Sequence, residues 1–295
     1  MQTNNVAMKL QGKKLKSNKK SPVFIVVFIL FILYMISLIF PFLWAFMTTF
    51  KTESEFVNNR TYWPEVFDWT NYIDAFRQLS ANNSNMFVML LNSIWWSVGA
   101  TILAMICSTM SAYVVAKYKF PGRQVIYGVA IFTMMLPIVG AMPSQYTVYG
   151  ALGILDNPGM LLTTMGGFGF NFFVLYGFFR SLPWEYVEAC FLDGGGHLTT
   201  MVRVMLPMAT PVITSLAIVA FINVWNDYNT PIVFLESYPT LSSGLYLYQN
   251  ATMQHSVDIP LLFAGVLMSV IPALALFIGF QNSIMNMSFG GGLKG

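Results

Sequence analysis

Six long apolar runs, almost free of charged residues, constrain this sequence more than any other feature. Placing a charged side chain at the middle of a bilayer costs about 2.5–3.5 kcal/mol on insertion scales, so an apolar run of about 20 residues is typical of a helix that crosses a membrane. The runs are continuously apolar instead of alternating, which favours helices over the strands of a barrel. The predicted spans are residues 22–48, 86–116, 124–144, 160–179, 208–235 and 259–283.

The composition agrees with a membrane protein. Only 9% of the residues are charged and 56% are hydrophobic, whereas a soluble domain has about 25% charged residues. So few charges cannot cover a globule of this size, and the remaining surface must face lipid. Cys107 and Cys190 are predicted to be small packing residues and not a disulfide. We therefore expect an all-α integral membrane protein with six transmembrane helices.

The basic residues predict the orientation. Twelve of the 15 Lys and Arg residues fall on one side of this topology, and Lys51, Arg60 and Arg77 fall on the other. An excess of Lys and Arg marks the cytoplasmic side, so both termini are predicted to be cytoplasmic, in a bacterial plasma (inner) membrane. The apolar run Ser21–Phe50 is too long for a signal peptide and is predicted to be retained. The predicted parts are a basic tail (1–21), a first helix with its outer loop (22–85), a core (86–283) and a second cytosolic tail (284–295).

The segment 183–207, between the fourth and fifth spans, has the features of a helix–turn–helix at the cytosolic face. Pro183 suits the first turn of a helix, and Glu185 favours the positive end of the helix dipole. Asp193-Gly194 is predicted to interrupt this helix, because glycine readily adopts the positive φ of a helix end. A second short helix is predicted from about Leu198 to Pro207. Such a segment could transmit force from a cytosolic partner into spans four and five.

The same segment resembles the EAA loop of ABC importer permeases, whose signature is E-A-A-x3-G-x9-I-x-L-P. Cys190 replaces the second Ala and Val204 replaces Ile, while many relatives have Ala and Ser or Thr in place of Gly195-Gly196. The resemblance implies that this loop docks into a cleft of a separate ATPase and couples ATP hydrolysis to the gate. The implied coupling residues are Glu188, Ala189, Asp193, Gly194, Leu206 and Pro207.

Other stretches resemble the carbohydrate-uptake permeases of the maltose type, in particular the smaller maltose-transporter permease. These stretches are Leu91-Asn92-Ser93, residues 119–123, Trp225-Asn226-Asp227-Tyr228 and the tail 290–295. The resemblance implies a binding-protein-dependent inner-membrane component that works with a second permease, two copies of an ATPase and an extracellular solute-binding protein. It also implies that Leu293 and Lys294 reach between the ATPase subunits, and that the polar outer loop 236–258 touches the binding protein.

Asp227 is the only acidic residue within a predicted span, which makes it a candidate for the solute path together with Asn223, Asn226 and Tyr228. A structural role is the alternative, because Asp227 lies close to the outer interface. Trp95 and Trp96 also have two possible roles: they could stack on a sugar ring, or they could pack against lipid or other helices.

The sequence lacks the phosphate-binding pattern G-x-x-x-x-G-K-[ST], so no ATPase site is expected on this chain. His197 and His255 fall on opposite sides of the predicted topology, which argues against a shared metal or catalytic site. The prediction is a transport subunit without enzyme activity or cofactor of its own, with ATP and Mg²⁺ bound by the partner ATPase. It would form half of the path for a carbohydrate, and the family resemblance implies an oligosaccharide. A permease for glycerol phosphate or a polyol, or an ion-coupled secondary transporter, is the alternative.

Overall fold

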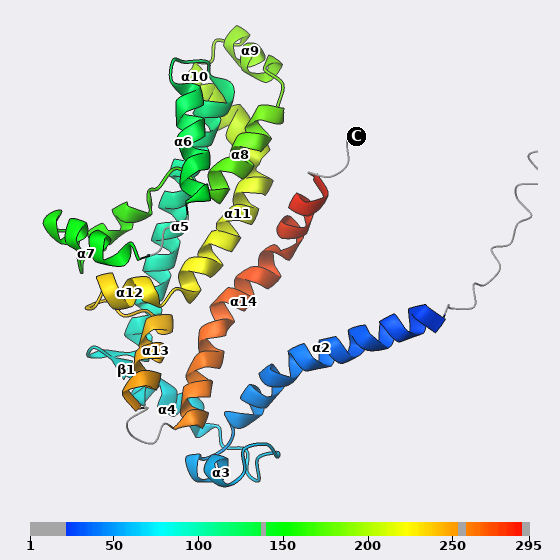
Figure 1. Ribbon diagram of the computed structural model, residues 1–295, viewed down its shortest axis with the longest axis vertical. Coiled ribbons are helices and arrows are strands. Elements are labelled where there is room, and N and C mark those ends of the chain that lie inside the picture. The colour runs from blue at the N-terminus through cyan, green and yellow to red at the C-terminus, as the bar shows by residue number, and fades with distance from the viewer. Residues whose placement is uncertain (1–21, 137–139, 253–257, 291–295) are drawn as a thin grey trace, which may run out of the picture.

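The computed structural model describes residues 22–136, 140–252 and 258–290 (Figure 1). The predicted tail contacts Leu293 and Lys294, the basic tail and His255 lie outside the described residues. The elements begin with α2 (Pro22–Thr48), α3 (Glu53–Asn58), α4 (Thr70–Gln78), the two-residue antiparallel strands β1 (Ser80–Ala81) and β2 (Ser84–Asn85), α5 (Met86–Lys117), α6 (Arg123–Met135) and α7 (Met142–Ala151). They continue with the 3₁₀-helix η1 (Pro158–Thr164), α8 (Phe170–Ser181), α9 (Glu185–Leu192), α10 (His197–Thr199), the π-helix η2 (Thr200–Met205), α11 (Leu206–Asn226), α12 (Asn229–Phe234), α13 (Leu241–Thr252) and α14 (Ile259–Gly290).

Four helices in the described part of the chain are long and apolar enough to cross a membrane. They are Pro22–Thr48, Met86–Lys117, His197–Asn226 and Ile259–Gln281. The helical membrane architecture predicted from the sequence is therefore confirmed, with four candidate spans in the described residues where six had been predicted.

The prediction of one continuous helix over 124–144 was wrong. Helix α6 ends at Met135, and Leu136 is already extended, with a ψ of 119°. The sequence explains this end, because Leu136 precedes Pro137 and a residue before proline is pushed out of the helical region. The chain is helical again in α7 after Gly140, whose φ is +76°.

The prediction of one helix over 160–179 was also wrong. Helix η1 ends at Thr164 and α8 begins at Phe170, with a non-helical connection between them. This connection contains Gly166, Gly167 and Gly169, and glycine weakens a helix interior because its backbone loses more freedom on ordering.

The fifth predicted span differs at both of its ends. Helix α11 stops at Asn226, because the Asp227 carboxylate accepts the backbone N–H groups of Asn229 (2.9 Å) and Thr230 (3.2 Å) and so starts the separate helix α12. At the other end, the predicted break at Pro207 is absent, since His197–Asn226 is one continuous helical stretch. The π-helical turn η2 ends at Met205, two residues before Pro207. Such turns change the hydrogen-bond spacing inside a helix, and this one lies beside a proline that has no N–H to donate.

Helix α5 is the central element and contacts α8, α11 and α13. At the end of the molecule where α9 lies, Tyr113, Phe179 and Met205 belong to one buried cluster from α5, α8 and η2. At the opposite end, Met89 and Leu245 belong to a second cluster that joins α5 to α13 and α14. Helix α14 is tied to α11 by the Trp225 indole, which donates to the Ser269 carbonyl at 3.0 Å.

In the described part of the segment 236–258, predicted to be a polar outer loop, residues Leu241–Thr252 are helical. This helix, α13, lies along α5, with the N–H of Leu241 donating to the Ser93 hydroxyl at 2.7 Å. The spacing of Leu241 and Leu245 explains the helix, because residues four apart share one helix face and both side chains are buried.

Helix α2 diverges from the bundle and approaches it only near its C-terminal end (Figure 1). There the Trp44 ring packs edge-on against Phe263 of α14 with a centroid separation of 5.5 Å, and the Trp44 indole donates to the Arg60 carbonyl at 2.9 Å. From Pro22 to Leu43 every residue is exposed within this chain.

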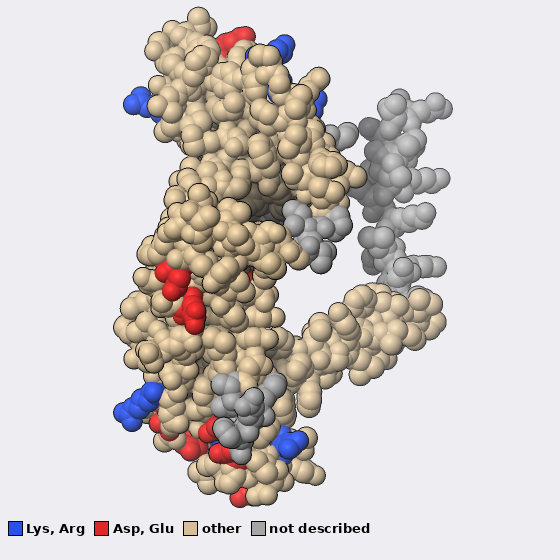
Figure 2. All heavy atoms as spheres, turned by 60° about the vertical axis from the view of Figure 1, so that its left-hand side comes forward, with Lys and Arg blue, Asp and Glu red and all other residues tan. Residues whose placement is uncertain are grey.

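Charged side chains gather mainly toward the two ends of the face in Figure 2, and a group of acidic side chains lies between them. Wide uncharged regions separate these groups. This pattern suits a protein whose middle faces lipid, where charged side chains are costly.

A close contact between α4, α13 and α14 leads to a stability prediction. A Cβ atom added at Gly265 would lie 2.4 Å from Leu79 Cδ1 and 2.9 Å from Leu245 Cδ2, whereas Gly279 of the same helix has open space around it. We expect Gly265→Val to destabilise the protein by about 1–3 kcal/mol through overpacking, and Gly279→Val to have a much smaller effect. Thermal aggregation of the purified protein in detergent measures both, and equal midpoints for the two variants would contradict the prediction.

Candidate functional site

The α9–α10 segment (residues 183–199) forms one extreme end of the molecule (Figure 1). Helix α9 is anchored by Val187, which is completely buried in the cluster that contains Tyr113 and Phe179. Glu188 and Ala189 are exposed on the same helix. The segment therefore holds α9 firmly on one side and leaves a carboxylate free to meet another molecule.

The predicted turn after α9 is confirmed. Gly194 has a φ of +80°, the left-handed region that favours glycine, and its N–H donates to the Phe191 carbonyl at 3.0 Å. The N–H of Gly195 donates to the Cys190 carbonyl at 2.8 Å, so that the last carbonyl groups of α9 are satisfied within the turn. Asp193 and Gly194 are both exposed at the tip.

The other two predicted coupling residues lie apart from this turn. Leu206 and Pro207 are the first residues of α11, where Leu206 packs against the buried cluster and Pro207 is exposed. They are therefore placed at the junction of the π-helical turn with α11, and not at the tip formed by Asp193 and Gly194.

Two departures from the EAA pattern lie against each other. A Cβ atom added at Gly195 would lie 2.6 Å from Cys190 Sγ and 2.9 Å from the Cys190 carbonyl oxygen. The sulfur atom thus occupies space that an alanine at position 195 would need, which explains why glycine stands there.

This contact predicts an interaction between two substitutions. Gly195→Ala is expected to loosen the α9–α10 segment and speed its cleavage by proteinase K, while Gly196→Ala, which has open space around it, serves as the control. Adding Cys190→Ala should slow the cleavage of Gly195→Ala only in part, because the carbonyl contact remains. Contacting residues are expected to be non-additive; strictly additive cleavage rates would contradict the proposed contact.

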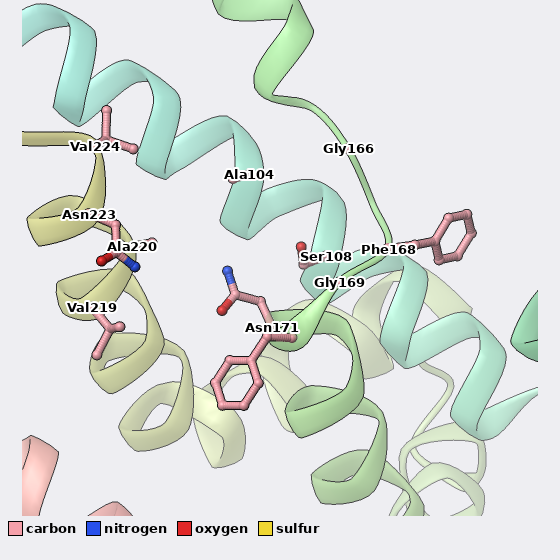
Figure 3. Close-up of a pocket in the computed structure, with 11 residues that line it drawn as sticks. Ala104, Ser108, Gly166, Phe168, Gly169, Asn171, Val219, Ala220, Asn223 and Val224 are labelled. Carbon is pink, nitrogen blue, oxygen red and sulfur yellow. The ribbon is translucent and has the colours of Figure 1, made fainter. Parts of the chain in front are cut away.

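A cavity of about 350 Å³, here called the α8 cavity, lies between α5, α11 and the start of α8 (Figure 3). Ala104 and Ser108 of α5 line it together with Asn223 of α11 and Asn171 of α8. Figure 3 shows Asn171 extending from the first turn of α8 toward α11, on which Asn223 lies, while Phe168 points away. Amide groups can both donate and accept hydrogen bonds, so this wall suits a neutral polyhydroxylated molecule.

A second cavity of about 220 Å³, here called the α12 cavity, lies further along the same two helices. It shares Val224 of α11 with the α8 cavity. Its other lining residues are Trp96, Ala100, Gln145, Tyr149, Met160, Thr163, Thr164, Asp227, Thr230 and Phe234.

The wall of the α12 cavity is fixed by contacts between distant segments. The Asp156 carboxylate accepts the Ser237 N–H (2.8 Å) and hydroxyl (2.6 Å), and the Asp156 N–H donates to the Phe234 carbonyl at 2.9 Å. These bonds join the segment before η1 to the end of α12. Aromatic surfaces and hydrogen-bonding groups together are typical of a site for an uncharged polar solute.

The four predicted path residues do not form one group. Asn223 lines the α8 cavity and Asp227 lines the α12 cavity. Asn226 lines neither of these cavities and donates instead to the Ile222 carbonyl at 2.8 Å, while Tyr228 stacks on Tyr246 with a centroid separation of 4.5 Å. The contacts of Asp227 with the start of α12 also support the structural alternative.

The two tryptophans of α5 also have different surroundings. Trp96 lines the α12 cavity and is buried, and its indole Nε1 has no hydrogen-bond partner among the described residues. The Trp95 indole donates to the Asn92 side chain at 3.2 Å and its ring packs edge-on against Tyr238. Packing therefore accounts for Trp95, whereas Trp96 also forms part of a cavity wall.

Sequence reasoning missed Asn171, Gln145 and the pair Thr163-Thr164. Asn171 is the only amide side chain in the apolar run 160–179, and this isolated polar residue was a signal that could have identified it. Gln145 could not be identified in this way. It lies in α7 and lines the α12 cavity only because the chain breaks between α6 and α7. In the described part of the chain, no three His, Cys, Asp or Glu residues are grouped so as to hold a metal ion.

The sequence is similar to known transport proteins. The pattern of the family described as "binding-protein-dependent transport system inner membrane component" matches residues 104–283. A diacetylchitobiose uptake system permease protein of Streptomyces coelicolor is 33% identical over 86% of this chain and 84% of its own length. A trehalose transport system permease protein of Mycobacterium tuberculosis is 26% identical over 86% of this chain and 92% of its own length.

A solved structure has the same fold. One chain of a bacterial ABC transporter involved in the import of the acidic polysaccharide alginate aligns with a TM-score of 0.76. The alignment covers 90% of this chain and 98% of that chain, at 22% sequence identity.

Proposed function

The chain belongs to the family of binding-protein-dependent transport system inner membrane components, and on this basis we propose that it is the permease subunit of an ATP-driven importer for a carbohydrate. The observation that best supports coupling to an ATPase is the α9–α10 segment, in which an anchored helix presents Glu188 beside a glycine turn at one end of the molecule. Glu188 would meet a basic group of the ATPase, and Asp193 and Gly194 would form the tip that enters its cleft.

The proposed topology has six crossings with both termini in the cytoplasm. Helices α2, α5, α11 and α14 each supply one crossing, the segment from α6 supplies the third, and η1 with α8 supplies the fourth. Lys119, Arg123 and Arg180 lie near the ends of α5, α6 and α8 at the end of the molecule where the α9–α10 segment lies, and Arg203 lies in η2, which directly follows α10 (Figure 1). An excess of such residues on one side supports a cytoplasmic position for that segment.

The proposed assembly contains a second homologous permease, two copies of a cytosolic ATPase and an extracellular solute-binding protein. ATP and Mg²⁺ would bind to the ATPase subunits, because this sequence has no phosphate-binding loop of the G-x-x-x-x-G-K-[ST] type. Leu293 and Lys294 would contact the ATPase subunits. Helix α13, at the opposite end from α9, would face the binding protein.

The α8 and α12 cavities together would form this chain's half of the solute path. Their walls combine amides, hydroxyl groups and aromatic rings, which can bind the hydroxyl groups and the ring faces of a sugar. The relatives named for diacetylchitobiose and trehalose support a carbohydrate as the solute, and the proposal favours an oligosaccharide.

Reconstitution tests this function directly. The complete transporter, with both permeases, the ATPase and the binding protein, is placed in proteoliposomes and supplied with radiolabelled oligosaccharides, a polyol and glycerol phosphate. Uptake of an oligosaccharide that requires both ATP and the binding protein is the expected result. Uptake restricted to the polyol or to glycerol phosphate would overturn the carbohydrate assignment, and ATP-independent uptake abolished by an ionophore would overturn the ATP-driven mechanism.

A further inference from the structure

Two consecutive residues at the end of α5 contact the two ends of the α9–α10 segment. Lys117 Nζ donates to the Leu182 carbonyl at 2.5 Å, and Leu182 is the residue that ends α8 just before this segment. The Tyr118 hydroxyl lies 3.0 Å from His197 Nδ1, with which it shares a hydrogen bond, and His197 is the first residue of α10. The two attachments are thus 15 residues apart in sequence and meet at neighbouring positions of one helix end.

The attachment at Tyr118 is strengthened by aromatic contacts that involve His197, Trp184 and Phe191. The Tyr118 ring packs edge-on against His197, with a centroid separation of 5.2 Å, and against Trp184 at 6.1 Å. Phe191 of α9 packs edge-on against the His197 ring, with a centroid separation of 4.9 Å. A displacement of α9 therefore cannot leave Tyr118 unaffected without breaking these contacts.

The attachment at Lys117 involves a buried cation. Lys117 is only 9% exposed, and a buried charge is costly unless it is hydrogen-bonded. The bond to the Leu182 carbonyl is charge-assisted and hence stronger than a bond between neutral groups. It fixes the start of the α9–α10 segment relative to α5.

Helix α5 leads from these attachments to both cavities. Ser108 of the α8 cavity is nine residues from Lys117, about 14 Å at 1.5 Å per residue, and Trp96 of the α12 cavity is 21 residues away, about 32 Å. The helix is unbroken over this distance. It contacts α8 and α11 along its length, so that a shift of α5 changes the width of both cavities.

We propose that Lys117, Tyr118 and His197 are positioning residues that transmit the movement of α9 to α5, and through α5 to the walls of the α8 and α12 cavities. This inference rests on the proposed coupling of α9 to an ATPase. It adds a route that the EAA pattern does not contain, since neither Lys117 nor Tyr118 belongs to that segment. The hydrogen bonds keep the two ends of the segment at a fixed separation, so that pressure on α9 displaces α5 and does not merely flatten the turn.

The test measures how many solute molecules the reconstituted complete transporter moves per ATP hydrolysed. The double variant Lys117→Met, Tyr118→Phe is expected to lower this ratio about tenfold, while ATP hydrolysis and assembly with the ATPase persist. Lys117→Arg should keep the ratio of the unmodified transporter, because a guanidinium also donates to a carbonyl. Tyr127→Phe, which removes a hydroxyl group from α6 outside these contacts, is the matched control.

A minimal pair of substitutions keeps the test independent of folding defects. Tyr118→Phe and His197→Phe each remove one side of the hydrogen bond between these two side chains while an aromatic ring remains, and Tyr118→Phe also removes the 3.2 Å hydrogen bond to the Tyr113 hydroxyl. The two substitutions together should therefore lower the ratio no further than Tyr118→Phe alone. An unchanged ratio in both the Lys117→Met, Tyr118→Phe variant and the Tyr118→Phe variant, in a transporter whose uptake is ATP-driven, would overturn the inference. Absence of ATP-driven uptake in the unmodified transporter would instead overturn the proposed function.

Discussion

A transporter carrying Gly194→Val is expected to assemble and reach the membrane but to lose nearly all ATP-driven uptake. Gly194 has a φ of +80° at the exposed tip after α9. Side chains other than glycine cost about 1–2 kcal/mol in this left-handed region, and a β-branched residue is a genuine outlier there. The turn must therefore change its conformation, which alters the position of α9 against the ATPase. Uptake should fall about tenfold or more, since about 1.4 kcal/mol corresponds to a factor of ten.

The adjacent Gly196 provides the matched control. Its φ of −93° and ψ of −179° are extended and suit a β-branched residue, and a Cβ atom there meets no neighbour within 4 Å. Gly196→Val should therefore retain most of the uptake. For each variant, uptake is measured in proteoliposomes, and the amount of ATPase that co-purifies is measured to check assembly. Wild-type uptake by Gly194→Val would remove the turn from the coupling mechanism.

The second large effect is expected from Val224→Trp, which should block the solute path. Val224 lines both the α8 and the α12 cavity, so an indole at this position reduces the space in each. Uptake should fall to the level of liposomes without transporter. Binding of the ATPase should persist, because Val224 is 25 residues beyond Thr199 in the continuous helical stretch His197–Asn226, about 38 Å along at 1.5 Å per residue.

The control for this blockade is Val98→Trp. Val98 lies on α5 but is 41% exposed and lines neither the α8 nor the α12 cavity. The same increase in volume at this position should leave uptake close to that of the unmodified transporter. If both variants transport equally well, the two cavities are not the path.

The four longest apolar helices could be predicted from the sequence, because lipid solubility and backbone hydrogen bonding leave a long apolar run few other conformations. The breaks inside 124–144 and 160–179 were harder to predict. Proline and glycine residues were visible there, but such residues are tolerated in many membrane helices when neighbours satisfy the freed backbone groups. Whether a span bends or breaks thus depends on contacts that lie outside the span itself.

The turn after α9 could be predicted closely because its information is local, whereas the predicted end of the second helix at Pro207 was wrong. The turn at Gly194 requires only a residue that tolerates a positive φ, and the anchor Val187 lies within the same helix. The cavities could not be predicted to the same degree. Asn223 and Asn171 are 52 positions apart in sequence and line one cavity only because α8 and α11 both pack near α5.

The divergent helix α2 has a consequence for how the protein is made. Its backbone hydrogen bonds are internal, and its side chains from Pro22 to Leu43 need no neighbour from this chain to be stable in lipid. Because synthesis begins at the N-terminus, α2 can leave the translocation machinery and settle in the bilayer before any later helix exists. The remainder of the chain then folds while already tethered to the membrane, and the contact between Trp44 and Phe263 closes only after α14 has been inserted.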